Sequence, residues 1–348
     1  MTRRPRRKSD FKIYKFLFVY FSALILVLNI LPALLVGGWW SSGEKEQLRK
    51  AEVYKEPREP AREDLKLDIY HVEKEELVNM ELEEYIVGVV AGEVPANFHP
   101  QAIKAQAVAA RTYAKHKARN EDLSCKYHED ADLCTDFNCC QEFKTLETAL
   151  SQWEPEKREE NMERIKDAVY STAGIVLSYG EGIINSVYHS TCGGKTEDAG
   201  AVWSGSGSHP YLSSVECGYC QHSSHYEQEI AMELSAFARN LSSQHGITLL
   251  GEDNAPSLEV KKTSDTGRNK LVRLGNETLT GLEIRRILDL PSTDFSWRVE
   301  GNHLIFETRG FGHGVGLCQY GADGMAQEGK NFEEILKYYY SGADLVKY

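Results

Sequence analysis

The sequence predicts an α+β protein, anchored in a membrane, in which a helical segment and a β-rich lobe form a cleft. Three observations lead to this fold class: a long uncharged run near the N-terminus, helical patterns over 82–93 and 101–119, and strand-like segments from 174 onward. Because the strands and helices do not alternate regularly, a mixed architecture is expected rather than a parallel α/β sheet.

The N-terminus predicts a single-pass anchor in the cell membrane. Residues 1–15 contain seven Lys or Arg and one Asp, and residues 16–40 form a run of 25 residues without a charge. A spanning helix needs about 20 apolar residues, and basic residues mark its cytoplasmic side. We therefore expect 1–15 to be a cytoplasmic tail, 16–40 a transmembrane anchor, and the remainder to lie outside. A cleaved signal peptide is the alternative, although no A-x-A site follows the run.

The rest of the chain divides into a linker and one extracytoplasmic domain. Residues 41–65 are highly charged and poor in apolar positions, which is typical of a linker, and 66–348 are long enough to bury a large core. The whole chain has a net charge of −12; removing the +6 of the basic tail leaves −18 for 41–348. Such an acidic surface argues against nucleic acid as a partner.

Local patterns place the elements of this domain. Helices are expected over 82–93, 101–119 and 161–172, near 228–244, and from Thr280 and Asn331, where Glu283 and Glu334 complete capping boxes. Hairpins are expected over 174–190 and 258–274, and one further strand over 303–310.

Glu93 is the candidate acid of what we expect to be a helical catalytic segment. The apolar residues of 82–93 follow helical spacing, and position 93 falls about 20° from Leu82 around the helix. Pro95 ends the helix just beyond it. A carboxyl group buried at a helix end has a raised pKa, so it can donate a proton at neutral pH. A glutamate turned back to solvent is the alternative.

A cysteine-rich stretch over 125–140 predicts either a zinc site or disulfides. The spacing His128-x5-Cys134-x5-Cys140 offers one ligand set, and Cys125 and Cys139 are spare candidates. Structural zinc takes four nitrogen or sulfur ligands. Since the adjacent Cys139 and Cys140 do not pair easily with each other, zinc is favoured over a local disulfide network.

The other four cysteines are Cys192, Cys217, Cys220 and Cys318. The spacing Cys217-x2-Cys220 occurs in redox motifs and in metal half-sites, but no thioredoxin-like βαβ unit surrounds it. We expect a disulfide or plain thiols here.

Two segments are candidate walls of a binding site. Residues 188–203 leave a strand with His189 and Thr191, and 309–322 contain five glycines around His313, followed by Gln319. Glycine at this density allows positive φ or a close approach to a ligand, and the P-loop pattern GxxxxGK[ST] is absent. These side chains suit a sugar or a peptide, and a solvated loop is the alternative reading of 188–203.

Taken together, the segments 82–114, 187–203, 209–220 and 309–326 resemble the stage II sporulation protein D family of spore-forming bacteria. The resemblance implies a peptidoglycan lytic transglycosylase that cleaves the MurNAc–GlcNAc β-1,4 bond and leaves 1,6-anhydro-MurNAc ends, with Glu93 as its acid and base. It also implies Zn²⁺ on His128, Cys134 and Cys140 that supports the site. Residues proposed to orient the substrate are Arg111, Tyr113, His189, Thr191, His313 and Gln319.

The resemblance further implies a setting and partners. The substrate would be glycan strands stripped of peptides by an amidase, stage II sporulation protein P, with stage II sporulation protein M as a membrane scaffold. The glycan strands would be cleaved during engulfment, by an enzyme in the mother-cell membrane around the forespore. Two other functions remain open: a non-enzymatic glycan-binding or amidase-enhancer module, and a zinc hydrolase, although no HExxH helix occurs.

Overall fold

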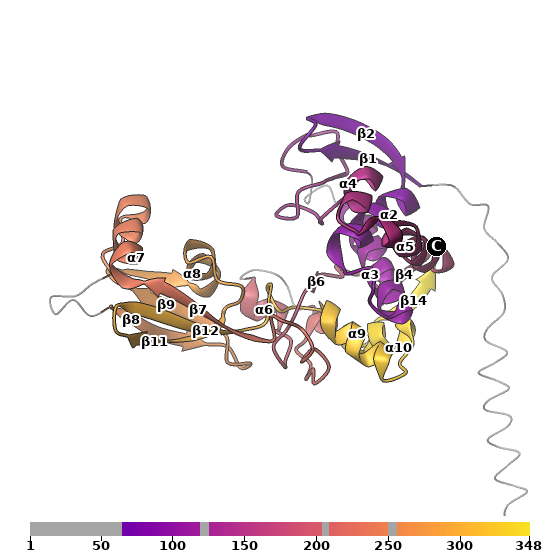
Figure 1. Cartoon of the computed structure of the whole chain (residues 1–348). Helices are drawn as coiled ribbons and strands as arrows, with labels where there is room; N and C mark the ends of the chain where they lie inside the picture. Colours follow the sequence, from indigo (N-terminus) through magenta and orange to yellow (C-terminus); the bar gives the residue numbers. More distant parts are fainter. Residues whose placement is uncertain (1–64, 119–124, 204–208, 250–255) are drawn as a thin grey trace, which may run out of the picture. The chain divides into compact units, whose positions relative to one another are not determined.

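The computed structural model describes residues 65–118, 125–203, 209–249 and 256–348. The predicted tail and anchor, and all of the predicted linker but Leu65, lie outside these ranges. No helix within them is long and apolar enough to cross a bilayer. The described residues form a mixed α+β structure with several small sheets, so the predicted fold class is confirmed at this level (Figure 1).

The helices are α2 (Leu82–Glu93), α3 (Pro100–Ala118), α4 (Leu146–Ser151), η2 (Pro155–Lys157), α5 (Arg158–Ser171), α6 (Ala199–Val202), η3 (Pro210–Leu212), α7 (Leu234–Asn240), η4 (Leu241–His245), α8 (Gly281–Ile287), α9 (Gln319–Gln327) and α10 (Phe332–Tyr339). The strands are β1 (Lys66–His71), β2 (Glu76–Glu81), β3 (Leu133–Cys134), β4 (Ile175–Tyr179), β5 (Gly182–Ile183), β6 (Tyr188–His189), β7 (Glu227–Glu233), β8 (Leu258–Thr263), β9 (Asn269–Leu274), β10 (Glu277–Thr280), β11 (Asp294–Glu300), β12 (His303–Arg309), β13 (Leu317–Cys318) and β14 (Asp344–Lys347).

Helix α3 is the centre of the helical part. It contacts α2, α5, α9, α10 and strand β4. Its small side chains allow these neighbours to approach closely. The alanines that it buries are Ala102, Ala105, Ala107, Ala109, Ala110 and Ala114. Helix α2 ends at Glu93 because Val94 is extended in front of Pro95, as the sequence predicts.

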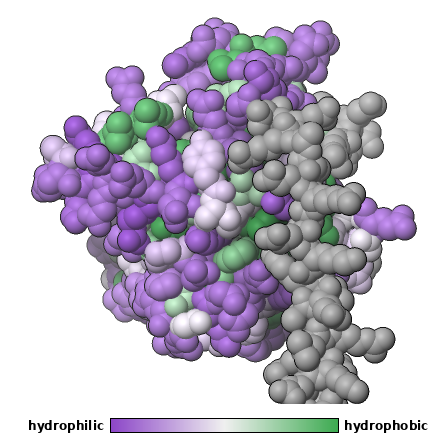
Figure 2. Space-filling view, turned by 90° about the vertical axis from the view of Figure 1, so that its right-hand side faces the viewer, coloured by the Kyte–Doolittle hydropathy of each residue, from purple (hydrophilic) through white to green (hydrophobic). Residues whose placement is uncertain are grey.

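The strands form separate small sheets. The orders among the described residues are β2-β1-β3, β10-β9-β8, β11-β12-β7, β14-β4-β5 and the parallel pair β13-β6. A hydrophobic core separate from the one around α3 includes the fully buried Val272, Ile284 and Phe306, from β9, α8 and β12. On the face shown in Figure 2, hydrophilic residues predominate and apolar residues appear only in small patches.

Most predicted elements are present, and one is wrong. Of the hairpin expected over 174–190, only the short pairing of β4 with the two residues of β5 is present. The hairpin over 258–274 forms as β8–β9, and both predicted capping boxes close their helices. The helix expected near 228–244 is instead strand β7 followed by α7, because residues 227–233 pair along the whole of β12. Pairing with a distant strand therefore overrides the local helical pattern.

The glycine loop owes its shape to backbone conformation. Gly310, Gly312, Gly314 and Gly316 all have positive φ, between 71° and 110°. A Cβ on Gly316 would lie 2.1 Å from the carbonyl oxygen of Val187, so the loop packs directly against the chain entering β6. These glycines make room for neighbouring protein atoms.

We predict that Gly316→Ala destabilises the protein more than Gly301→Ala. Gly301 also has positive φ, but a Cβ there would meet nothing within 4 Å. The left-handed backbone should cost about 1 kcal/mol at either position, and the clash at Gly316 about 1–3 kcal/mol more. Urea unfolding measures both values, and equal costs would contradict the close packing.

Candidate active site

The carboxylate of Glu93 accepts hydrogen bonds from three separate segments. Its Oε1 accepts from the backbone N–H of Glu142 at 2.9 Å and lies 3.3 Å from the hydroxyl of Tyr188. Its Oε2 accepts from the side-chain amide of Gln319 at 3.4 Å. The side chain is thus held at the end of α2 by the loop after β3, by β6 and by α9.

Burial raises the pKa of Glu93 to about 7, and the nearby Glu142 carboxylate adds to this effect. The three hydrogen bonds oppose the rise because they favour the charged form. Desolvation prevails, so close to neutral pH both forms of the carboxyl group are populated. That balance suits a group that must first donate a proton and then accept one.

Tyr188 connects Glu93 to a further amide. Its hydroxyl donates to Oε1 of Gln141 at 2.7 Å, which is shorter than its 3.3 Å separation from Glu93. The single phenol proton serves one acceptor at a time, so Tyr188 can turn it from Gln141 to Oε1 of Glu93 when that carboxyl group is ionised. Burial raises the pKa of Tyr188 well above its ordinary value, so it remains a neutral phenol.

Gln319 connects Glu93 to α3. Its amide nitrogen also lies 3.5 Å from Oε1 of Gln106, whose own amide nitrogen is buried without a partner among the described atoms. Turning both amides would let Gln319 accept from a protonated Glu93 and from Gln106. The two amides are therefore compatible with either protonation state of the carboxyl group.

The predicted strand exit and glycine loop lie side by side. Parallel pairing of β6 with β13 sets Tyr188 opposite Leu317 and His189 opposite Cys318, and Thr191 bridges to Phe311. Gln319 follows β13 directly. This pairing is why residues far apart in sequence reach the same carboxylate.

The two predicted histidines form a pair beside this junction. The rings of His189 and His313 lie 5.6 Å apart, and Trp203 lies 5.2 Å from His313. Burial lowers the pKa of His189 well below its ordinary value, and burial with the nearby Arg285 lowers that of His313 to about 4. Both rings are neutral at pH 7, and the buried Nε2 of His189 has no partner among the described atoms.

Three other predicted residues are not among those that hydrogen-bond to Glu93 in the described part of the chain. Arg111 is fully buried, and its guanidinium forms an ion pair with Glu83 at 2.6 Å. The hydroxyl of Thr191 lies 2.7 Å from that of Ser223. Tyr113 is partly buried, and burial raises its pKa to about 12. Arg111 thus joins α2 to α3 and has no guanidinium face exposed to a ligand.

The two acids of the 188–203 segment also have structural partners. Glu197 is buried, and its Oε2 accepts from the hydroxyls of Ser264 at 2.5 Å and Thr266 at 2.6 Å. Asp198 caps α6 by accepting from the N–H of Gly200 at 2.8 Å. Both carboxylates hold the chain in place.

Sulfur atoms converge in the cysteine-rich loop. Cys134 Sγ lies 3.4 Å from Cys140 Sγ, and Cys125, Cys134 and Cys139 have sulfurs within 4.8 Å of one another. A thiolate-rich set of this kind fits structural zinc. His128 belongs to no such group among the described residues; its ring stacks on Tyr70 at 5.5 Å.

Sequence reasoning missed several members of the site. Tyr188, Gln141 and Gln106 contact Glu93 or its partners, and the backbone of Glu142 supplies its shortest hydrogen bond. Tyr188 is adjacent to the predicted His189 and Gln106 lies on the predicted helix. The 141–142 segment carries no motif.

The chain is similar to proteins of known family. A family model described as Stage II sporulation protein matches residues 70–179. Stage II sporulation protein D of Bacillus subtilis (strain 168) is 34% identical over 335 residues, which cover 93% of this chain and 94% of that protein. Its counterpart from Bacillus amyloliquefaciens is 34% identical over 80% of this chain and 77% of its own length. The amidase enhancer of Bacillus subtilis (strain 168) is 26% identical over 75% of this chain and 40% of its own length.

We predict that Arg111→Leu lowers the free energy of unfolding by about 3–5 kcal/mol, because it leaves the Glu83 carboxylate without its buried partner. Arg158→Leu, at an exposed position, should change it by about 0.5 kcal/mol or less. Urea unfolding at neutral pH tests both variants. Wild-type stability in Arg111→Leu would argue against the structural role.

We also predict that Glu93 makes stability depend on pH. The folded chain keeps a proton on Glu93 up to about pH 7, whereas the unfolded chain releases it near pH 4.5. The wild type should therefore lose stability relative to Glu93→Gln as pH rises between these values, by at most about 1.4 kcal/mol per pH unit. Unfolding at pH 5 and pH 8 measures the difference. Glu84→Gln, exposed on the same helix, is the control, and a pH-independent difference would refute the raised pKa.

Proposed function

Because the chain belongs to the stage II sporulation protein D family, we propose that it is a lytic transglycosylase acting on peptidoglycan during sporulation. The observation that carries this proposal is Glu93: one partly buried carboxyl group with a pKa of about 7, held by donors from three segments. Membership in the family supports the coarser role in sporulation and the cell wall.

The proposed reaction needs one acid that also acts as a base. Protonated Glu93 donates its proton to the glycosidic oxygen while the bond from C1 of MurNAc to that oxygen breaks. The resulting carboxylate removes the proton from the C6 hydroxyl, whose oxygen bonds to C1. The products are a GlcNAc end and a 1,6-anhydro-MurNAc end, Glu93 regains its proton, and no water is consumed.

The two oxygens of the Glu93 carboxyl group have different neighbours, which suggests different roles in the proposed reaction. Among the described residues, Oε1 has two neighbours within hydrogen-bond distance, Glu142 N–H and Tyr188, whereas Oε2 has only the long contact with Gln319. We assign the transferred proton to Oε2, where the contact with Gln319 is easily replaced. Tyr188 and Gln319 then stabilise the carboxylate that forms during the first step.

The proposal is consistent with the contacts of the two acids in the 188–203 segment, neither of which is available as a nucleophile. A retaining hydrolase needs another carboxylate about 5 Å away. Glu197 and Asp198 are held by hydroxyl and backbone donors, so neither is placed to attack a sugar. The nucleophile is then the substrate's own C6 hydroxyl.

We further propose a zinc ion in the cysteine-rich loop. Cys134 and Cys140, with Cys125 or Cys139, supply the sulfur ligands, and His128 lies in the same loop. Bound there, zinc would stabilise the loop as a structural ion. Since residues 141–142 follow directly, the loop helps to position the Glu142 N–H that contacts Glu93.

The predicted setting enters the proposal as well. Residues 16–40 would anchor the protein in the mother-cell membrane with the domain outside, and an amidase and a membrane scaffold would be its partners. The second candidate function is an amidase-enhancing module without catalysis, which the amidase enhancer relative favours.

Product analysis tests the reaction. The full chain is incubated with peptide-free glycan strands, and the products are examined by mass spectrometry. We expect 1,6-anhydro ends with wild type and Glu84→Gln, and at least an approximately 100-fold loss with Glu93→Gln. The kcat/KM of wild type should fall above about pH 7, since the acid must begin protonated.

Other outcomes would replace the proposal. Reducing ends without the anhydro group would indicate a hydrolase. Glycan binding without products, together with stimulation of an amidase that persists in Glu93→Gln, would indicate the enhancer module. Release of stem peptides that depends on zinc but not on Glu93 would indicate a zinc amidase.

A further inference from the structure

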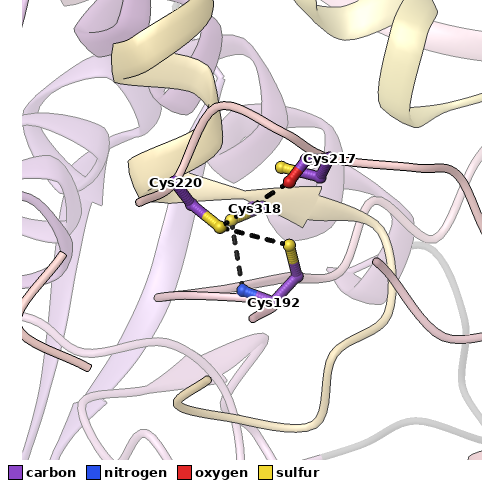
Figure 3. A group of neighbouring side chains, drawn as sticks. All are labelled: Cys192, Cys217, Cys220 and Cys318. Atoms are coloured by element: carbon purple, nitrogen blue, oxygen red, sulfur yellow. Dashed lines mark hydrogen bonds between the residues drawn. The ribbon is translucent and has the colours of Figure 1, made fainter. Parts of the chain in front are cut away.

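Four cysteines from three separate segments meet in the interior. Cys192 follows β6, Cys217 and Cys220 lie in the loop before β7, and Cys318 ends β13 (Figure 3). Their sulfurs all lie within 4.8 Å of one another, and each side chain is at most 1% exposed. None of the four forms a disulfide.

We propose that these four cysteines bind one tetrahedral zinc ion as a structural site. Zinc–sulfur bonds of about 2.3 Å place thiolates of a tetrahedral site about 3.8 Å apart. The sulfurs of Cys192 and Cys220 are 3.5 Å apart, which is close to that spacing. Binding releases the four thiol protons to solvent and leaves a Zn(Cys)₄ group with a net charge of −2.

The arrangement favours a metal over two disulfides. A disulfide needs sulfurs about 2.05 Å apart and joins cysteines two by two. Here all four sulfurs lie within 4.8 Å of one another, so they form one group and not two separate pairs. The spacing Cys217-x2-Cys220 is also that of a metal half-site, in which one turn presents two thiolates to the same ion.

Donors around the sulfurs are those that a thiolate cluster needs. Cys318 Sγ accepts from the backbone N–H of Cys192 and of Gly321, both at 3.3 Å. The hydroxyl of the buried Tyr339 lies 3.1 Å from Cys217 Sγ. Such second contacts orient the ligands of a metal and spread its negative charge.

A buried positive charge lies next to the cluster. Arg268 is 3% exposed and donates to the carbonyl oxygen of Cys192 at 2.5 Å, while its Nε has no partner among the described atoms. A guanidinium is costly to bury unless a negative charge is near. The carboxylate of Asp294 already interacts with Arg268, and the net −2 of a zinc tetrathiolate would add further negative charge beside it.

The site is closed and therefore structural. Four protein ligands leave no position for water or substrate. The ion would instead join the exit of β6 to the end of β13, next to Tyr188 and Gln319, which both contact Glu93. This zinc is separate from the one proposed in the cysteine-rich loop, and it does not depend on the proposed reaction.

Native and denaturing mass spectrometry of the full chain, purified with zinc present, test the site without any variant. We expect bound zinc in the native protein and four unmodified thiols at these positions in the denatured protein. Two disulfides among the four cysteines, seen as a loss of about 4 Da, would overturn the proposal.

Two reciprocal variants assign the ion to this cluster. Cys134→Ser/Cys140→Ser removes ligands of the cysteine-rich loop and should retain one zinc ion with four sulfur ligands at about 2.3 Å by X-ray absorption. Cys217→Ser/Cys220→Ser should hold one zinc ion fewer than wild type. A folded loop variant without zinc, or a folded Cys217→Ser/Cys220→Ser variant with the wild-type content, would overturn the proposal. Because either result decides the question, failure of one variant to fold leaves the test intact.

Discussion

The short parallel pairing of β6 with β13 is the constraint on which the site depends. It sets two segments separated by about 130 residues in fixed register, Tyr188 against Leu317 and His189 against Cys318. Gly310 and Gly316, which have positive φ, allow that approach, since a Cβ at either position would meet the backbone of the neighbouring segment. Tyr188 and Gln319 thereby reach Glu93, which comes from the end of a helix in another part of the chain.

The properties of Glu93 follow from competition between two effects. Removing the carboxylate from water raises its pKa, and the donors around it lower the pKa by a smaller amount. With fewer donors the group would stay neutral; with full exposure it would stay ionised. The observed combination leaves both forms accessible, and the amides of Gln106 and Gln319 can serve either form.

The sequence correctly predicts the features of the fold that depend on residue spacing and on local backbone conformation. The stripe ending at Glu93, the capping boxes and the glycine loop belong to this class. The strand at 227–233 was missed because its pairing with β12 is non-local. Arg111 lies on the predicted helix, but only the structure reveals its ion pair with Glu83.

Gln141 and the Glu142 N–H reach the site through loop geometry that no motif encodes. The second cysteine group was expected to hold a disulfide or plain thiols because one C-x2-C spacing does not reveal that Cys192 and Cys318 converge on it.

The four buried cysteines also imply that the order of events during folding affects the final structure. In the proposed location outside the membrane, these thiols would meet both metal ions and oxidants, and a thiolate bound to zinc or joined in a disulfide is not available to the other reaction. Whichever reaches the unfolded chain first would determine whether the proposed zinc site forms beside Glu93 or whether disulfides join these cysteines instead. Enclosure by the finished fold then shields the outcome from later redox change.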